Sequence, residues 1–294
     1  ETLIMNIYRT IDRNKVQFDF MVFTNEQADY DEEIKQLGGV IYHMPSFKGY
    51  NYLRLNNCFR KFFQEHSYDI VHGHIGSLAP LYLRQAKKYG AYTIVHSHST
   101  RSNQFWGSKI HYLLSHRVVN IADFFMACSV QAGIDRFGKD IVRQQNFKVI
   151  NNGINVDKYK YSEEKHNELK KSFGMQNKIV FGHVGRFSQE KNHKFLIDLF
   201  YEIQKRMDEA ILVLVGRGHL EKEIKEQVIV RGIENKVVFL GVRKDVPDLM
   251  NLFDAFIFPS LFEGFGIVGI EALAAGLPCF FSVGFVKEEK VTKD

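Results

Sequence analysis

The chain alternates between short apolar runs and amphipathic stretches along almost its whole length. Runs rich in β-branched and aromatic residues occur at 17–23, 39–44, 69–74, 92–98, 124–129, 148–151, 178–184, 210–215, 236–240, 255–258 and 278–282. Segments with helical periodicity lie between them, at 51–66, 77–88, 193–206 and 219–231. Alternation of this kind is typical of parallel sheets covered by helices on both faces. We therefore predict an α/β fold.

The length of the chain favours about two domains, since it has 294 residues. Two successive series of strands and helices are separated by a polar stretch at 152–177 that contains little strand-like sequence. We place the boundary at the start of this stretch. The predicted domains are residues 1–152 and 153–294, each with a Rossmann-like fold.

Composition limits the class of protein. Hydrophobic residues make up 45% and charged residues 25%, as in ordinary globular proteins. There are three cysteines and no C-x-x-C pair, so no disulfide framework is expected and a cytoplasmic location fits. The net charge of +5 suits anionic substrates or an anionic membrane surface. The basic residues are dispersed, which argues against a nucleic-acid partner. No apolar run reaches the length of a membrane span.

The most specific stretch begins where the apolar run 255–258 stops at Pro259. A glycine-containing loop and then a helix pattern follow, with Glu263 and Glu271 framing the loop and the first helical turns. A strand end, a tight loop and a helix N-terminus together form the usual ligand site of an open α/β sheet. Eight helical residues span about 12 Å, which suits the two ends of a sugar nucleotide better than a single reacting bond.

A second loop with two cations follows the predicted strand at 178–184. Gly185 permits a close backbone approach. Arg186 and Lys191 can neutralise a diphosphate and stabilise it as a leaving group, although two solvated surface cations are the alternative. The Gly-x-Gly turn at 216–218 is a weaker signal, because it can be only a tight turn. We expect Asp245 to cap the helix that follows it.

Four histidines stand at the ends of two predicted strands in the first domain. They are His72, His74, His96 and His98. Ligands of open α/β sheets bind at such strand ends. The His-x-His spacing also occurs in zinc sites. No acidic or cysteine partner has suitable spacing nearby, so no metal site is predicted.

The glutamate stretch resembles the E-x7-E signature of retaining family 4 glycosyltransferases, which have the GT-B fold of two Rossmann-like domains facing across a cleft. The resemblance implies that Glu263 contacts the donor sugar and Glu271 the nucleotide ribose. It also implies that the backbone amides of Phe265, Gly266 and Ile267 meet the sugar and phosphate.

Other segments match the same family in the same order along the chain. Gly185, Arg186 and Lys191 look like the G-R-x-x-x-x-K element that binds the donor pyrophosphate. The backbone of Val242 and Arg243 matches the segment that meets the base. His96 matches the strand-end histidine near the reaction centre, against the alternative of a buried core histidine. The catalytic residues implied are His96, Arg186, Lys191 and Glu263.

The resemblance implies transfer of a sugar, with retention of configuration, from a UDP- or GDP-sugar to a lipid-linked or oligosaccharide acceptor. No cofactor and no metal are expected. The first domain is expected to bind the acceptor and the second the donor. The motifs look most like bacterial enzymes of capsule or exopolysaccharide assembly. Association with the inner face of the cell membrane is an option, because residues 100–118 combine cationic and aromatic side chains on a predicted helix; an ordinary packed helix is the alternative.

The ends of the chain differ from the family pattern. Residues 1–8 read as a helix with no preceding strand and Gly-Gly loop, and the chain stops shortly after the run at 278–282. We expect an enzyme truncated at both ends, or else a compact natural variant. Two other functions stay open: a donor-binding fragment or accessory subunit without turnover, and a nucleotide-sugar epimerase of the same architecture.

Overall fold

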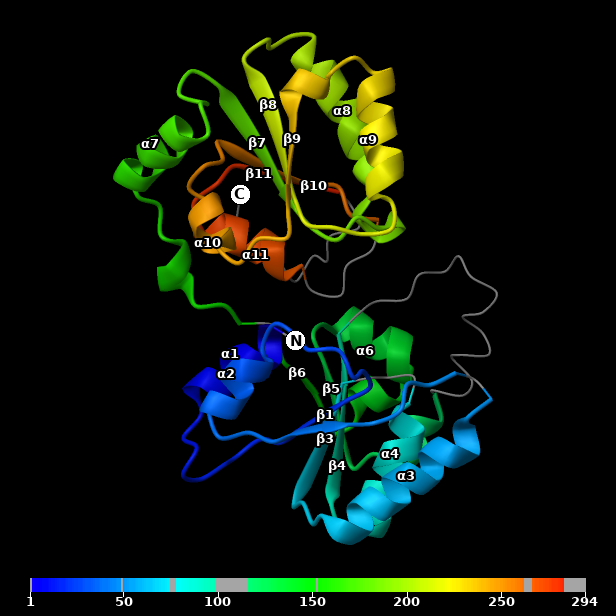
Figure 1. Ribbon diagram of the computed structural model, residues 1–294. Coiled ribbons are helices and arrows are strands. Elements are labelled where there is room, and N and C mark those ends of the chain that lie inside the picture. The colour runs from blue at the N-terminus through cyan, green and yellow to red at the C-terminus, as the bar shows by residue number, and fades with distance from the viewer. Residues whose placement is uncertain are drawn as a thin grey trace. The chain divides into compact units, whose positions relative to one another are not determined.

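The computed structural model describes residues 2–48, 50–74, 78–98, 116–151, 153–261 and 266–282. The chain divides into two compact units, residues 1–153 and 154–294 (Figure 1). Each unit is an α/β structure with its own hydrophobic cores.

The first unit contains two parallel sheets in the residues described. Four strands lie in sequence order, namely β3 (Ile70–Gly73), β4 (Tyr92–Ser97), β5 (Phe124–Ala127) and β6 (Phe147–Val149). A separate parallel pair is formed by β1 (Phe20–Val22) and β2 (Ile41–His43). The carboxyl ends of β3 and β4 therefore lie next to each other.

The helices of the first unit follow the apolar periodicity of the sequence. They are α1 (Thr2–Thr10), α2 (Asp31–Gln36), α3 (Tyr52–Glu65), α4 (Ala79–Lys88) and α6 (Val130–Phe137). In α3 the buried side chains are Leu55, Phe59, Phe62 and Phe63, the spacing that places apolar groups on one helical face. Ser129 caps α6 by accepting a hydrogen bond from the Ala132 amide at 3.1 Å.

The second unit has one parallel sheet in the order β11-β10-β7-β8-β9. These strands are β7 (Ile179–Val184), β8 (Ala210–Val215), β9 (Val237–Gly241), β10 (Ala255–Phe258) and β11 (Cys279–Phe281). Every residue of β8 is buried, as expected for a central strand with both faces covered. The chain builds the sheet outward from β7 to β9 and then returns to add β10 on the other side of β7. The strand order thus reverses between β7 and β10, and ligands of such sheets bind beyond the strand ends at this switch point.

Five α-helices belong to the second unit in the residues described. They are α7 (Glu163–Ser172), α8 (His193–Gln204), α9 (Glu221–Val230), α10 (Val246–Leu249) and α11 (Ile267–Ala274). The two sides of the sheet carry separate cores, with Phe253, Phe256 and Phe258 in one, and Phe181 and Phe200 in the other. The predicted parallel α/β architecture with two Rossmann-like units is confirmed. The polar stretch 152–177, predicted only as a boundary, also contains α7.

Candidate functional site

The second unit brings the arginine–lysine loop and the start of the glutamate loop together at the switch point between β7 and β10. The amide of Leu261 donates to the carbonyl of Glu190 at 2.8 Å. The side-chain amide of Asn192 donates to the carbonyl of Pro259 at 3.3 Å. Asn192 has a left-handed backbone, with φ of 55°, which lets the chain turn directly from the loop into α8. Two motifs far apart in sequence therefore form one continuous surface.

The two cations of this loop have different settings. Arg186 is exposed, whereas Lys191 is partly buried and its Nζ lies 4.6 Å from the centroid of the buried Phe258 ring. An ammonium over an aromatic face is stabilised by the ring quadrupole. The stem of Lys191 also passes close to Gly185, where an added Cβ would lie 3.4 Å from Lys191 Cδ. Lys191 is thus held in place beyond the end of β7, whereas Arg186 is exposed to solvent.

Two buried histidines, His183 and His193, lie beside the loop that carries Arg186 and Lys191. His183 Nδ1–H donates to the carbonyl of Ile257 at 2.8 Å, and the ring of His193 stacks on Phe187 with centroids 4.1 Å apart. Burial lowers the pKa of His183 to about 3 and that of His193 to about 4. Both are neutral at pH 7 and add no positive charge beneath the cations. The sequence analysis assigned these residues no role; the only signal was a histidine inside the apolar run of β7.

The Gly-x-Gly turn after β8 packs directly against this loop. The Gly185 amide donates to the Val215 carbonyl at 2.9 Å, and the Phe187 amide donates to the Arg217 carbonyl at 3.0 Å. A Cβ added to Gly216 would lie 2.1 Å from the carbonyl oxygen of Gly185, and a Cβ added to Gly218 would lie 2.3 Å from the carbonyl oxygen of Phe187. The two glycines therefore allow backbone contact between neighbouring loops, a structural role that a tight turn alone does not explain.

Replacing Gly218 with alanine should displace the arginine–lysine loop. The new methyl group overlaps a backbone carbonyl, so we expect a loss of about 1–3 kcal/mol in the free energy of unfolding, measured by urea denaturation. The matched control is Gly153→Ala, because a Cβ there meets nothing within 4 Å. Equal stability of the two variants would contradict the packing role of Gly218.

Glu271 is buried in α11 and is bound by a tyrosine from the start of the second unit. The hydroxyl of Tyr159 donates to Glu271 Oε1 at 2.6 Å. Burial raises the pKa of Glu271, and the hydrogen bond from Tyr159 acts in the opposite direction. Tyr159 ends a short 3₁₀ helix, Val156–Tyr159, and was missed by the sequence analysis because no local pattern ties it to a residue so far along the chain.

The rest of the glutamate motif is described in part. Gly266 is buried and immediately precedes α11, and Ile267 is the first residue of that helix. The first N–H groups of a helix have no intrahelical acceptor and carry partial positive charge, which suits a phosphate or a sugar oxygen. Glu263 and Phe265 lie outside the described residues.

The predicted base-binding segment follows β9 beside the Gly-x-Gly turn. The Gly216 amide donates to the Gly241 carbonyl at 2.7 Å, and Val242 is 62% exposed. Arg243 pairs with Asp245, with Nε 2.8 Å from Oδ1. Asp245 does stand at the N-cap of α10, but its side chain makes no capping hydrogen bond. The predicted N-cap position is confirmed, but the Arg243 guanidinium, rather than a helix amide, binds the carboxylate.

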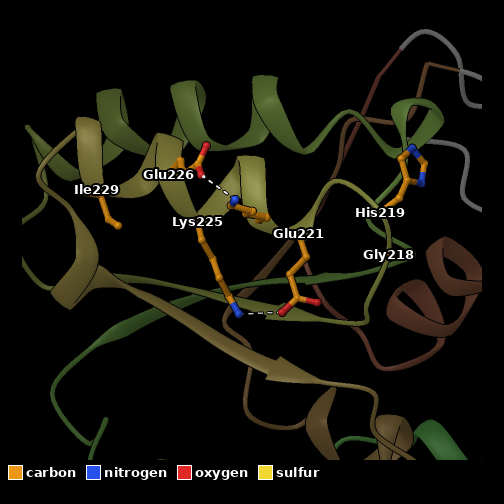
Figure 2. Close-up of a pocket in the computed structure, with 7 residues that line it drawn as sticks. Gly218, His219, Glu221, Lys225, Glu226 and Ile229 are labelled. Atoms are coloured by element: carbon orange, nitrogen blue, oxygen red, sulfur yellow. Dashed lines mark hydrogen bonds and ion pairs between the residues drawn. The ribbon is translucent and has the colours of Figure 1, made fainter.

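A separate hollow of about 510 Å³ lies along α9 (Figure 2). Its lining residues are Gly218, His219, Glu221, Lys222, Lys225, Glu226 and Ile229. Lys225 is 2.7 Å from Glu221, and Lys222 is 4.0 Å from Glu226. Because both lysines already face carboxylates, this hollow suits a diphosphate less well than the Arg186–Lys191 loop does.

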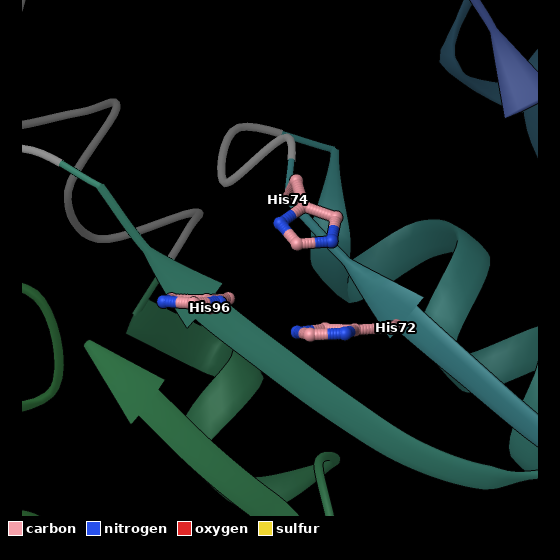
Figure 3. Close-up of side chains that lie close together, drawn as sticks. All are labelled: His72, His74 and His96. Atoms are coloured by element: carbon pink, nitrogen blue, oxygen red, sulfur yellow. The ribbon is translucent and has the colours of Figure 1, made fainter. Parts of the chain in front are cut away.

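The first unit gathers its strand-end histidines on one face of the sheet. His72 pairs with Ile94 in the β3–β4 register, so the positions of His74 and His96 fall opposite each other, and alternate residues share a face. His96 is 3% exposed and lies one residue before the end of β4, and its ring is parallel to that of His72 with centroids 5.4 Å apart (Figure 3). Sequence reasoning placed these histidines at strand ends, and the structure brings them into contact.

The predicted lipid-contacting helix at 100–118 falls almost entirely outside the described residues; Arg117 and Val118 belong to a 3₁₀ helix, Arg117–Asn120. Among the helices described, none combines the length and apolarity needed to span a bilayer.

Comparison with known proteins identifies the family. Residues 1–158 match the model of Glycosyltransferase Family 4, and residues 164–292 match that of Glycosyl transferases group 1. The chain belongs to glycosyltransferase family 4. This family 4 chain is 34% identical over 288 residues to the Bacillus subtilis protein EpsF, assigned as a glycosyltransferase, covering 96% of this chain and 75% of EpsF.

Two further likenesses support the fold and the class of protein. The first is 30% identity over 145 residues to an Escherichia coli UDP-Gal:α-D-GlcNAc-diphosphoundecaprenol α-1,3-galactosyltransferase, covering 48% of this chain and 38% of that enzyme. Among solved structures, Anabaena HepE in complex with UDP matches with a TM-score of 0.80 and 23% identity, over 99% of this chain and 79% of HepE. The GT-B architecture expected from the sequence is therefore confirmed.

Proposed function

We propose that this family 4 glycosyltransferase moves a sugar from a UDP- or GDP-sugar to a lipid-linked or oligosaccharide acceptor with retention of configuration, in the synthesis of a cell-surface polysaccharide. The second unit binds the donor and the first binds the acceptor. No metal ion is needed at the diphosphate, because side-chain cations take that role.

The observation that carries this proposal is the joining of the Arg186–Lys191 loop to the start of the glutamate loop. Hydrogen bonds from Leu261 and Asn192 hold the two loops together at the switch point of the donor sheet. The cations stand on one loop, and the helix N-terminus at Gly266 stands after the other. Positive charge on one side and helix amides on the other suit a diphosphate joined to a sugar.

The reaction follows from these groups. The bond between the anomeric carbon and the diphosphate oxygen breaks, and the nucleoside diphosphate leaves. Arg186 and Lys191 stabilise the charge that develops on it. The acceptor hydroxyl oxygen bonds to the anomeric carbon on the same face, and its proton passes to the departing phosphate oxygen. Glu263 and Glu271 hold the donor, and His96 contacts the donor sugar, so no protein nucleophile is required.

The acceptor and the cellular role draw support from relatives. The Escherichia coli relative is named for a diphosphoundecaprenol-linked acceptor, which is a lipid-linked saccharide. An acceptor of that kind would place this chain at the inner face of the cell membrane, where its net charge of +5 favours anionic lipid.

The test is to incubate the purified chain with a panel of UDP- and GDP-sugars and a membrane lipid extract. Nucleotide release and glycosylation of the lipid are measured, and the anomeric configuration of the product is read by NMR. We expect acceptor-dependent transfer with retention, insensitive to EDTA. Donor hydrolysis or epimerisation without acceptor would instead identify an epimerase. Nucleotide binding without turnover would identify a donor-binding fragment, and no nucleotide binding would exclude all of these functions.

A further inference from the structure

The histidine cluster of the first unit has the composition of a metal site. One ring nitrogen from each of His72, His74 and His96 lies within 4.8 Å of the others (Figure 3). Neither ring nitrogen of His96 has a hydrogen-bond partner among the described residues, although its side chain is almost fully buried. A buried polar atom without a partner costs about 1–3 kcal/mol, so this ring is poised to accept a ligand.

We propose that His72, His74 and His96 bind one zinc ion. Imidazole nitrogens are ligands for zinc and related transition metals, whereas magnesium and calcium prefer oxygen. Zinc bonds of 2.0–2.1 Å in tetrahedral geometry require nitrogens about 3.3 Å apart, so modest side-chain rotations close the cluster. His72 is exposed, which gives the ion an entry route and leaves a fourth position for water or an anion.

His98 stands where it can orient one of the ligands. His74 Nδ1 lies 2.8 Å from His98 Nε2. With zinc on Nε2 of His74, its Nδ1–H donates to His98. Zinc-bound histidines commonly donate their second N–H to such a partner, which fixes the ring and raises its basicity. His98 is thus a positioning residue rather than a ligand.

No cysteine or acidic residue with suitable spacing lies near these histidines in the chain, so the sequence by itself predicts no zinc site. The third ligand comes instead from the neighbouring strand: His72 lies on β3, His74 directly follows β3, and His96 lies on β4. The site shares His96 with the proposed sugar transfer, but zinc binding can be measured without any donor or acceptor, so the two proposals can fail separately.

The test uses the chain without a polyhistidine tag, stripped with EDTA and freed of chelator. Zinc is titrated by calorimetry, and cobalt serves as an optical probe of tetrahedral coordination. We expect about one zinc per chain. His74→Asn and His96→Asn should abolish this binding, and His98→Asn should weaken it about 10–100-fold. His43→Asn is the matched control, since His43 is an exposed histidine of the same unit outside the cluster.

X-ray absorption of the wild-type zinc complex makes the test independent of whether the variants fold. Three imidazole ligands support the proposal. A zinc shell with one histidine or only oxygen ligands, unchanged affinity in well-folded His74→Asn and His96→Asn, or no stoichiometric uptake by the wild type would each overturn it.

Discussion

Alanine in place of Arg186 or Lys191 is expected to lower kcat/KM for sugar transfer by about 10²–10³-fold each. The reason is that a positively charged donor aimed at a leaving group contributes most as the bond breaks. Because Arg186 is exposed, the Arg186→Ala chain should remain as stable as the wild type. Lys191, in contrast, lies over the Phe258 ring. Activity is measured as nucleotide release and lipid glycosylation, and stability as Tm.

The matched control for these variants is Lys222→Ala. Lys222 is a cation of the same unit, its side chain is 91% exposed, and it faces Glu226 on α9. We expect its transfer rate to stay close to wild type. If Lys222→Ala lost as much activity as Arg186→Ala, general charge rather than this loop would attract the donor, and the proposed diphosphate site would be wrong.

Glutamine in place of Glu271 should move activity and stability in opposite directions. Loss of the proposed charge-assisted contact to the ribose, about 1.5–3 kcal/mol, should raise KM for the donor about 10–100-fold. The pKa of Glu271 in the folded chain is raised, chiefly by burial. The contribution of this carboxyl to stability is therefore complete at a pH below its pKa in the unfolded chain. That contribution is lost as the pH rises through its pKa in the folded chain. At pH 7 the uncharged glutamine avoids this penalty while still accepting from Tyr159, so unfolding should need more urea. The gain should vanish below about pH 4, where the wild-type side chain is also neutral.

Phenylalanine in place of Tyr159 provides the complementary experiment. It removes the hydroxyl that binds Glu271 and leaves a buried carboxylate without that partner, at a cost of about 1–3 kcal/mol in the free energy of unfolding. Tyr161→Phe is the control, because Tyr161 is 54% exposed.

The Glu271 prediction has its own contrary outcome. A Glu271→Gln chain that is less stable than wild type at pH 7 would contradict the burial penalty.

Local patterns were enough for much of the fold. The run at 210–215 is continuously apolar, and it forms the buried central strand β8 with the same bounds. The helical periodicity of residues 51–66 predicted α3, in which Phe59, Phe62 and Phe63 are buried on one helical face. Asp245 shows where such reasoning stops: its position at the N-cap followed from sequence, but its pairing with Arg243 did not.

The sequence alone determined the α/β class, the alternation of strands and helices and the residue types offered for donor binding, because these depend on periodicity and on short motifs. Tertiary structure decided which residues meet. The strand reversal between β7 and β10 joined the cationic loop to the start of the glutamate loop, and the fold of the second unit placed Tyr159 on Glu271. The pairing of β3 with β4 brought separate histidines together. Contacts between residues distant in sequence depend on strand order and register, which no local pattern encodes.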